Sequence, residues 1–398
     1  MFSYTSILCI NVVFDNFDDV IKLKRNMKKV VIASDSFKGT LSSFEICHLF
    51  SLELEKRKDI EPIYLPIADG GEGSLEAISH IVSGQFVEVK VHNLYFKNIK
   101  TKIFIDQNNN AYIESASCIG LNLTKEYHDP GLVSTFGVGE LILCAIELGC
   151  QNIYVFLGGS ATNDGGTGLA SALGTKFYDK NHEELLPVGL NLFEIEHIDN
   201  SETLKILNGV NIHVLSDVQS PFYGPNGAAY KFAKQKGAND VEIKLLDDGL
   251  IHLAKIAQKD LSIDINVPGS GAAGGLGGGL YAFANAKISS GIDTLLDLMH
   301  FDEIIKDSDA VITGEGKLDR QTFDGKVIDG IAKRCLKFNK NLILLVGLSE
   351  LSLDELKKLY PCVVALFETN KKHLPFEEIK QNAKEDYLNT IKELLPKL

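Results

Sequence analysis

Residues 152–174, NIYVFLGGSATNDGGTGLASALG, run from an apolar segment through a small, polar turn into a second apolar segment. The first segment holds β-branched and aromatic residues and predicts a buried strand, and the second predicts a helix. The turn between them, residues 158–168, contains only glycine, alanine, serine, threonine, asparagine and aspartate. Such a turn lets the backbone approach a ligand closely at a helix N-terminus. The stretch therefore favours an α/β fold with an anion site after a strand.

Strand and helix patterns alternate on both sides of this stretch. The alternating segments are residues 28–34, 42–58, 60–68 and 72–82, and then 309–316, 327–338, 341–347, 353–359 and 362–367. The first segment of each series is a short apolar run typical of a buried strand, and the second has the spacing of an amphipathic helix. This order predicts a parallel, doubly wound sheet whose strands come from both ends of the chain.

The middle of the chain differs, because three strand-like segments follow one another with only short turns between them. These segments are residues 86–93, 100–106 and 111–117. Turns of that length connect antiparallel strands, so the middle predicts a mixed sheet. We therefore expect an α/β protein of two domains: a Rossmann-like parallel α/β/α domain (residues 28–84 plus 286–398) and an inserted mixed α/β domain (residues 85–285). Residues 1–26 are expected to be an extension outside both.

Composition excludes several classes of function. The 398 residues carry 40 basic and 53 acidic side chains, a net charge of −13, which argues against a nucleic-acid or anionic-membrane partner. Seven scattered cysteines without a CxxC pair indicate reduced thiols rather than a disulfide framework or a zinc site. No apolar run reaches the roughly 18 to 20 residues of a membrane helix, and the N-terminus lacks signal-peptide features. We expect a cytoplasmic protein.

Three glycine-rich turns separate strand-like from helical segments, at residues 68–74, 158–168 and 268–279. A helix N-terminus supplies free N–H groups and a positive dipole end, so such turns are candidate anion sites. A plain tight connection is the alternative for any single turn. None matches GxxxxGK[ST] and none is a dinucleotide fingerprint. The candidate binding residues in these turns are Gly70, Gly71, Gly158, Gly159, Ser160, Asn163, Gly271, Gly274 and Gly275.

Charged residues cluster where the predicted strands end, which is where open α/β sheets bind ligands. The set is Asp35, Ser36 and Lys38, then Asp69 and Glu72, Asp164, Asp217, and finally Glu315, Lys317 and Asp319. A carboxylate here can act as a general base or hold Mg²⁺, and a lysine can neutralise a phosphate or a carboxylate. Helix capping or a solvated turn is the alternative for each residue alone. Together they indicate phosphoryl transfer or nucleotide binding.

The chain resembles the type I glycerate kinase family in an ordered set of motifs. They are SDSFKGTLSS, PIADGGEGS, TFGVGELI, GGSATNDGGTGLASALG, SDVQSPFYGPNGAA, FAKQKGA, PGSGAAGGLGGGL and VITGEGKLDRQTFDGK, from about residue 28 to near the C-terminus. The resemblance implies a two-domain kinase that uses ATP and Mg²⁺ to phosphorylate D-glycerate (R-glycerate) to 2-phosphoglycerate, with release of ADP. Alternatives are 3-phosphoglycerate as product, another small hydroxy acid as substrate, or a regulator that binds without turnover. The oligomeric state is left open.

Roles carried onto the matching positions are chemical hypotheses. Asp164 or Asp217 would be the base or a metal ligand, and Lys38 would pair with an anion. Asp69 completes the catalytic candidates, and Glu315 joins Asp217 as a candidate metal ligand. Three motifs depart from the family pattern, which usually has proline in the first, a further aspartate with asparagine in the second, and histidine in the third. This chain instead has Ser34, then Gln219 with Ser220, and Asp324.

Overall fold

A five-stranded sheet takes its strands from both ends of the chain. The computed structural model describes residues 27–67, 73–124, 128–323 and 325–398. The strand order is β15-β13-β11-β1-β2, and every neighbouring pair is parallel. The bounds are β1 Lys28–Ile32, β2 Ile60–Tyr64, β11 Ala310–Thr313, β13 Asn341–Val346 and β15 Val363–Glu368. The predicted parallel sheet is confirmed.

A six-stranded sheet lies beside it, in the order β10-β9-β6-β5-β4-β3. Its bounds are β3 Gly84–His92, β4 Asn98–Asp106, β5 Asn110–Glu114, β6 Asn152–Phe156, β9 Asn211–Leu215 and β10 Lys287–Ser289. β3, β4 and β5 pair antiparallel and the others parallel, which confirms the predicted mixed sheet. β10 belongs to this sheet although it follows residue 286. The division into domains itself stays a prediction.

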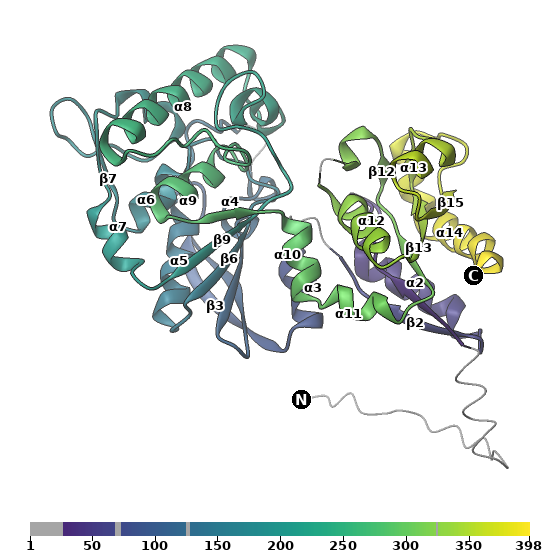
Figure 1. The fold of residues 1–398 in the computed structure, drawn as a ribbon. Coiled ribbons are helices and arrows are strands. Elements are labelled where there is room, and N and C mark those ends of the chain that lie inside the picture. The colour runs from purple at the N-terminus through teal and green to yellow at the C-terminus, as the bar shows by residue number, and fades with distance from the viewer. Residues whose placement is uncertain (1–26, 68–72, 125–127, 324) are drawn as a thin grey trace.

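Helices cover both faces of the five-stranded sheet (Figure 1). α2 (Ser43–Leu54) and α14 (Phe376–Leu394) share one apolar core with its strands, and α12 (Val327–Lys337) belongs to the core on the other side. α2 begins after Ser42, whose side chain accepts a hydrogen bond from the backbone N–H of Glu45. The remaining short elements of this part are β12 (Lys317–Leu318), β14 (Leu348–Ser349) and α13 (Leu353–Leu359).

The six-stranded sheet divides its side chains between two cores. In β6, Ile153 and Val155 join a core with α5 (Phe136–Glu147), α6 (Thr167–Ala172), α8 (Asp240–Leu261) and α9 (Leu276–Ala284). Phe156 points the other way, into a core shared with the five-stranded sheet. Alternation of faces along a strand explains the division. α8, a helix that the sequence analysis missed, carries a capping box formed by Asn239 and Glu242.

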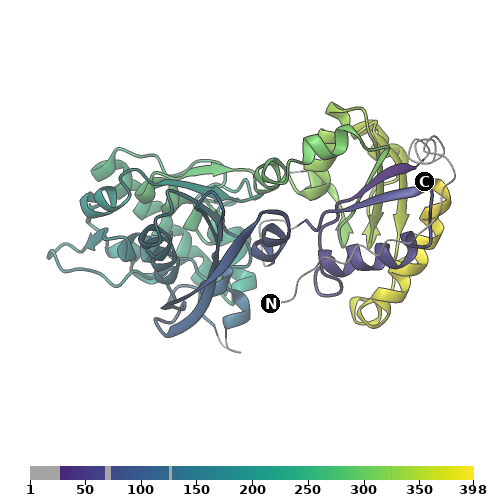
Figure 2. The ribbon, with the colours of Figure 1, turned by 90° about the horizontal axis from the view of Figure 1, so that it is seen from below.

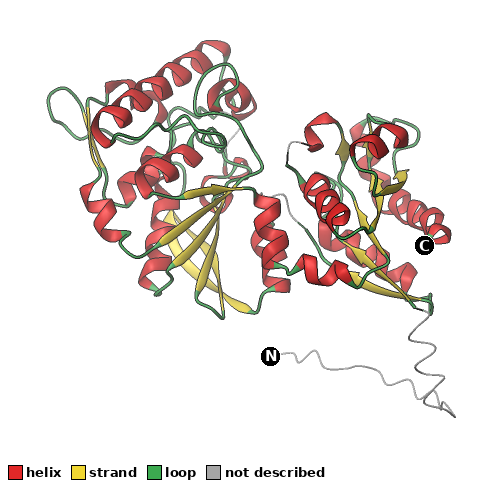
Figure 3. Ribbon diagram, viewed as in Figure 1, coloured by secondary structure: helices red, strands yellow, loops and turns green. Residues whose placement is uncertain are grey.

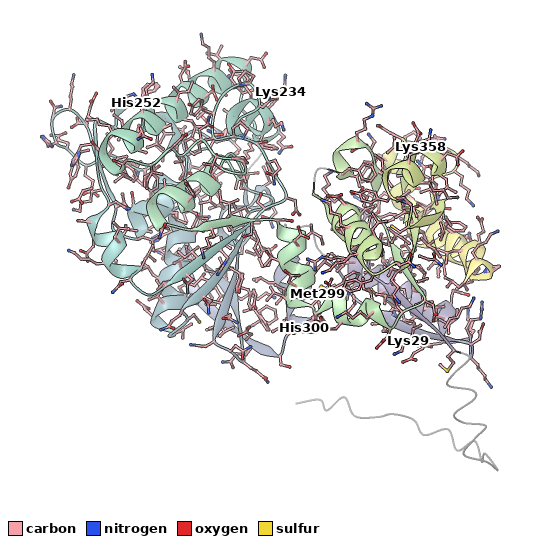
Figure 4. The ribbon with its side chains drawn as sticks, in the orientation of Figure 1. Lys29, Lys234, His252, Met299, His300 and Lys358 are labelled. Carbon is pink, nitrogen blue, oxygen red and sulfur yellow. The ribbon has the colours of Figure 1, made fainter. Side chains whose placement is uncertain are left out.

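Two helices lie between the sheets, as the views in Figures 1 and 2 agree. They are α3 (Ser74–Ile81) and α10 (Gly291–Leu298), and both contribute to the shared core. α11 (Phe301–Lys306) follows α10 and leads into β11, and Figure 4 labels Met299 and His300 at the bend between these helices. The sheets are therefore joined by packed apolar side chains as well as by the chain.

Smaller elements complete the part beside the six-stranded sheet (Figure 3). They are α4 (Ala116–Ile119), β7 (Lys176–Tyr178), β8 (His197–Asp199) and α7 (Ser201–Ile206), of which β7 and β8 pair antiparallel as a separate sheet. Among the described residues, none of the helices is both long and apolar enough to cross a membrane. The six cysteines in the described ranges are all free thiols, in agreement with the sequence analysis.

Candidate active site

A cleft of about 770 Å³ opens between the ends of strands from both sheets. Its walls are the loop after β1 (residues 36–42), the turn after β6 (residues 157–160) and the end of β9 (residues 215–218). Parallel strands present their carboxyl ends at one edge of a sheet, so loops distant in sequence converge there. The cleft suits a small polar substrate, because lysine, aspartate and serine side chains all line it.

A second cavity of about 510 Å³ adjoins the cleft at the end of the five-stranded sheet. The two cavities share part of the loop after β1, including Ser36 and Lys38, and they share Lys326 at the start of α12. Asp35, Glu315, Lys317 and Asp319 line the second cavity only. Six of the charged residues predicted at strand ends therefore line these two adjoining cavities, namely Asp35, Lys38, Asp217, Glu315, Lys317 and Asp319.

Lys236 is a candidate site residue that the sequence analysis missed. It lines the cleft yet is only 3% exposed, and its ammonium donates hydrogen bonds to Ser160 Oγ (2.9 Å) and to the Thr162 carbonyl (2.7 Å). Burial lowers the pKa of Lys236 to about 7, opposed by the charge of Asp164. A lysine has three donor hydrogens, and these bonds use two of them. The available signal was its place in FAKQKGA, one of the motifs that carry the family resemblance.

Asp164 lies behind the turn rather than in the wall of the cleft. Its carboxylate is fully buried and accepts hydrogen bonds from the N–H and hydroxyl of Thr135 (2.7 and 2.8 Å). It also accepts from the N–H groups of Gly166 (3.1 Å) and Gly168 (3.2 Å), at the start of α6. Burial raises the pKa of Asp164, and these four donors act against that effect. This geometry favours a positioning role over contact with substrate.

The glycines of the third turn approach another loop. A Cβ on Gly274, whose φ is +71°, would lie 2.0 Å from the Thr162 carbonyl oxygen, and a Cβ on Gly275 would lie 2.8 Å from the Gly165 Cα. Gly271, Gly274 and Gly275 are not among the residues that line the cleft, whereas Gly158 and Gly159 are. Several glycines in the turns at residues 158–168 and 268–279 therefore allow these two backbone segments to pack closely against each other.

Asp217 and Lys38, two of the predicted site residues, line the cleft. Asp217 follows β9, and its Oδ1 accepts a hydrogen bond from the backbone N–H of Ile292 in α10 (3.1 Å). Lys38 is exposed and also lines the second cavity. A carboxylate and a lysine on opposite walls can serve a reacting hydroxyl and an anionic group respectively.

Glu315, which follows β11, lines the second cavity and is 7% exposed. Burial raises its pKa, while a hydrogen bond from the Thr322 hydroxyl and the charge of Lys326 lower it. Asp35 is also buried and accepts a hydrogen bond from the Ser36 N–H (2.6 Å). Lys317, which is exposed, pairs with Asp319 (3.7 Å) and Glu350 (2.6 Å).

The remaining predicted residues fall into two groups. Asn163 is fully buried, and neither atom of its amide has a hydrogen-bond partner among the described residues. Five residues lie outside the described ranges: Asp69, Gly70, Gly71, Glu72 and Asp324, the last of which departs from the family pattern. Within the described ranges there is no group of three or more His, Cys, Asp or Glu side chains that could hold a metal ion.

Comparison with known proteins agrees with this arrangement. A family model described as the glycerate kinase family matches residues 30–397, which include every strand of both large sheets except the first two residues of β1. The chain belongs to the glycerate kinase family. It is an enzyme, and its class is that of the kinases.

Individual relatives are similar over most of their length. The glycerate 2-kinase of Escherichia coli is 39% identical over 323 residues, which cover 80% of this chain and 85% of the relative. The glycerate kinase of Halalkalibacterium halodurans is 37% identical over 327 residues, or 81% and 86%. A crystal structure from Salmonella typhimurium LT2 that carries the name glycerate kinase 2 has a TM-score of 0.77 and 34% identity, covering 93% of this chain and 97% of that one.

Proposed function

We propose that this enzyme transfers a phosphoryl group from ATP to D-glycerate, giving 2-phosphoglycerate and ADP. The observation that carries the proposal is the buried Lys236 in a cleft lined by Asp217 and Lys38, in a chain of the glycerate kinase family. Glycerate brings a carboxylate and two hydroxyl groups, and ATP brings phosphates. The cleft matches these groups with cations and a carboxylate.

The lysines of the cleft bind the anionic groups. In a phosphoryl-transfer transition state, charge spreads over the oxygens of the moving group, so catalysis depends on positioning and on fixed positive charge. Lys236 is held in place by Ser160 and Thr162 and directs its remaining donor hydrogen to an anion. Lys38 and Lys326 border both cavities and lie along the path between them.

Asp217 accepts the proton of the reacting hydroxyl in this proposal. It follows a strand end, lines the cleft and is fixed by its hydrogen bond to the start of α10. Asp164 acts indirectly, because its four hydrogen bonds shape the turn that carries Ser160. The sequence left Asp164 and Asp217 as alternatives for the base, and the proposal chooses Asp217.

Mg²⁺ is expected to arrive with the nucleotide. Mg²⁺ in kinases is usually bound by one or two carboxylates together with the substrate phosphates. The described residues fit that mode, because they offer single carboxylates at Asp217 and Glu315 rather than a three-ligand cluster. When bound, the ion neutralises charge on the phosphates.

A coupled assay tests the proposed function. Purified protein is incubated with Mg-ATP and D-glycerate, ADP release is followed, and enolase is added without phosphoglycerate mutase. The proposal requires ADP release that depends on D-glycerate and an enolase signal without mutase. A signal that needs mutase would mean 3-phosphoglycerate. ADP release only with other hydroxy acids, or binding without turnover, would favour the two remaining alternatives.

A further inference from the structure

We infer that the second cavity, at the end of the five-stranded sheet, binds the base and ribose of the nucleotide, with the C-terminal helix α14 as one wall. The inference rests on the proposed function in one respect, namely that the phosphoryl donor is a nucleoside triphosphate. It adds a set of residues from α14 and the loop before it, none of which the glycine-rich or acidic motifs contain.

The α14 side of the cavity is mostly apolar, with Asp386 as its polar exception. The apolar and aromatic side chains there and in the adjoining loops are Leu348, Leu374, Phe376, Ile379, Ala383 and Tyr387. Charged side chains from the strand ends and from α12, among them Lys38, Glu315 and Lys326, line the same cavity. Glycerate has no apolar surface to place against such a wall, whereas a flat nucleobase does.

The cavity is built by strand ends and closed by α14. Asp35, Glu315, Gly347 and Thr369 follow β1, β11, β13 and β15, so four neighbouring parallel strands end at its floor. This is the edge at which open α/β sheets bind nucleotides. Tyr387 of α14 is 1% exposed and packs edge-on against Phe37, with ring centroids 5.2 Å apart. The wall is therefore preformed.

Phe376, at the start of α14, stands at the mouth of the cavity. Its side chain is 50% exposed, and its ring lies over Gly39, where a Cβ would come within 2.7 Å of the ring. Gly39 belongs to the loop after β1, which also supplies Lys38 to both cavities. The exposed ring of Phe376 can stack on a nucleobase, and the neighbouring Lys38 can bind the phosphates.

This arrangement orders the ligand. The base lies against α14, the phosphates pass Lys38 and Lys326, and the terminal phosphate enters the cleft where Lys236 and Asp217 meet glycerate. The shared lining of the two cavities gives one continuous path. A side chain that blocks the apolar wall should therefore weaken the binding of ATP and ADP and leave the binding of glycerate unchanged.

Ala383→Trp fills the cavity, and Asn382→Trp adds the same ring at the neighbouring exposed position that does not line it. We expect Ala383→Trp to raise KM for ATP at least tenfold and to weaken ADP binding, measured by calorimetry, by a similar factor. KM for D-glycerate should stay within twofold of wild type, and Asn382→Trp should leave both values unchanged. Phe376→Ala, which adds no bulk, should raise KM for ATP about threefold or more.

Three outcomes decide the matter. A wild-type enzyme that turns over, together with unchanged ATP and ADP parameters in both cavity variants, would overturn the inference. A raised KM for D-glycerate with an unchanged KM for ATP would overturn it as well and assign the cavity to glycerate. If wild type shows no turnover with D-glycerate, the proposed function fails, and loss of ADP affinity in Ala383→Trp still supports the nucleotide cavity.

Discussion

Replacing Lys236 with methionine removes the buried cation while keeping a side chain of similar length. One charge-assisted donor aimed at a developing anion in a closed site contributes about 3 to 4 kcal/mol, so we expect kcat/KM to fall by roughly 10² to 10³. Lys236 is 3% exposed, and its two hydrogen bonds fix it at the cleft wall. We therefore expect the loss of the cation to appear in kcat/KM.

The same variant should not unfold the protein. Holding the Lys236 pKa at about 7 instead of 10.5 means that its burial costs the folded state roughly 4 to 5 kcal/mol when it is charged. Methionine avoids that cost but leaves two oxygen acceptors without a donor, which costs about 1 to 3 kcal/mol each. The two effects nearly cancel, so the free energy of unfolding at pH 7 should be within a few kcal/mol of wild type.

The direction in which stability changes with pH tests the depressed pKa of Lys236. A lysine with a depressed folded-state pKa makes the unfolded state bind more protons between about pH 7 and 10.5, so wild-type stability gains from this group as pH rises. Between pH 7.5 and 9 the gain is roughly 2 kcal/mol relative to Lys236→Met. Urea unfolding of both proteins across this range measures the difference, since other groups titrate alike in the two.

Kinetics across pH complete the test. If Lys236 acts as a cation, kcat/KM for D-glycerate should fall as pH rises above about 7 in wild type, and the profile of Lys236→Met should lack that step. A rise of kcat/KM through the same range would mean that the neutral amine acts as a base. Near-wild-type kcat/KM in Lys236→Met would refute the role altogether.

Three further predictions concern the supporting residues. Gly166→Ala should lower stability by about 1 to 3 kcal/mol more than Gly209→Ala in thermal unfolding, because both have positive φ but only at Gly166 would a Cβ meet another backbone, 2.8 Å from a Cα; equal losses would contradict the packing argument. Asp164→Asn should lower the free energy of unfolding in urea by about 2 to 4 kcal/mol, since the oxygens of Asp164 accept four hydrogen bonds. Unchanged stability with a hundredfold lower kcat would instead mean that Asp164 takes part directly in the reaction. Asp217→Asn should lower kcat by on the order of 10² and raise the Mg²⁺ concentration for half-maximal rate, with stability preserved because the amide oxygen can still accept from Ile292; near-wild-type kcat would remove it as the base.

The sequence predicted the architecture well because strands and helices have distinct periods. The β-branched runs that became β1, β6 and β13 and the antiparallel turns between β3, β4 and β5 needed only local information. α8 was missed although its capping box at Asn239 was readable.

The site was predicted less fully because identical residues serve different purposes. A glycine that admits a ligand and a glycine that admits another loop look alike in sequence, so Gly274 was assigned to binding although it packs against Thr162. Asp164 sits in the most distinctive motif, but only the fold shows that its oxygens are used by Thr135 and the start of α6. Lys236 was missed as a site residue because burial decides its chemistry, and burial is a tertiary property.

The α14 wall of the second cavity illustrates the same limit. Its residues lie more than 300 positions from the loop after β1 that they face, and the helix carries no motif. Nothing in the spacing of Phe376, Ile379 and Ala383 distinguishes an ordinary amphipathic helix from one that borders a ligand.

The most direct test of the central claim is the ³¹P NMR spectrum of the product formed from D-glycerate and Mg-ATP by the purified enzyme. A phosphate on the secondary carbon couples to one neighbouring proton and gives a doublet, whereas a phosphate on the terminal carbon couples to two and gives a triplet. The account predicts a new doublet that grows with ADP and is absent with Lys236→Met over the same time. A triplet, or no glycerate-dependent signal at all, would contradict it.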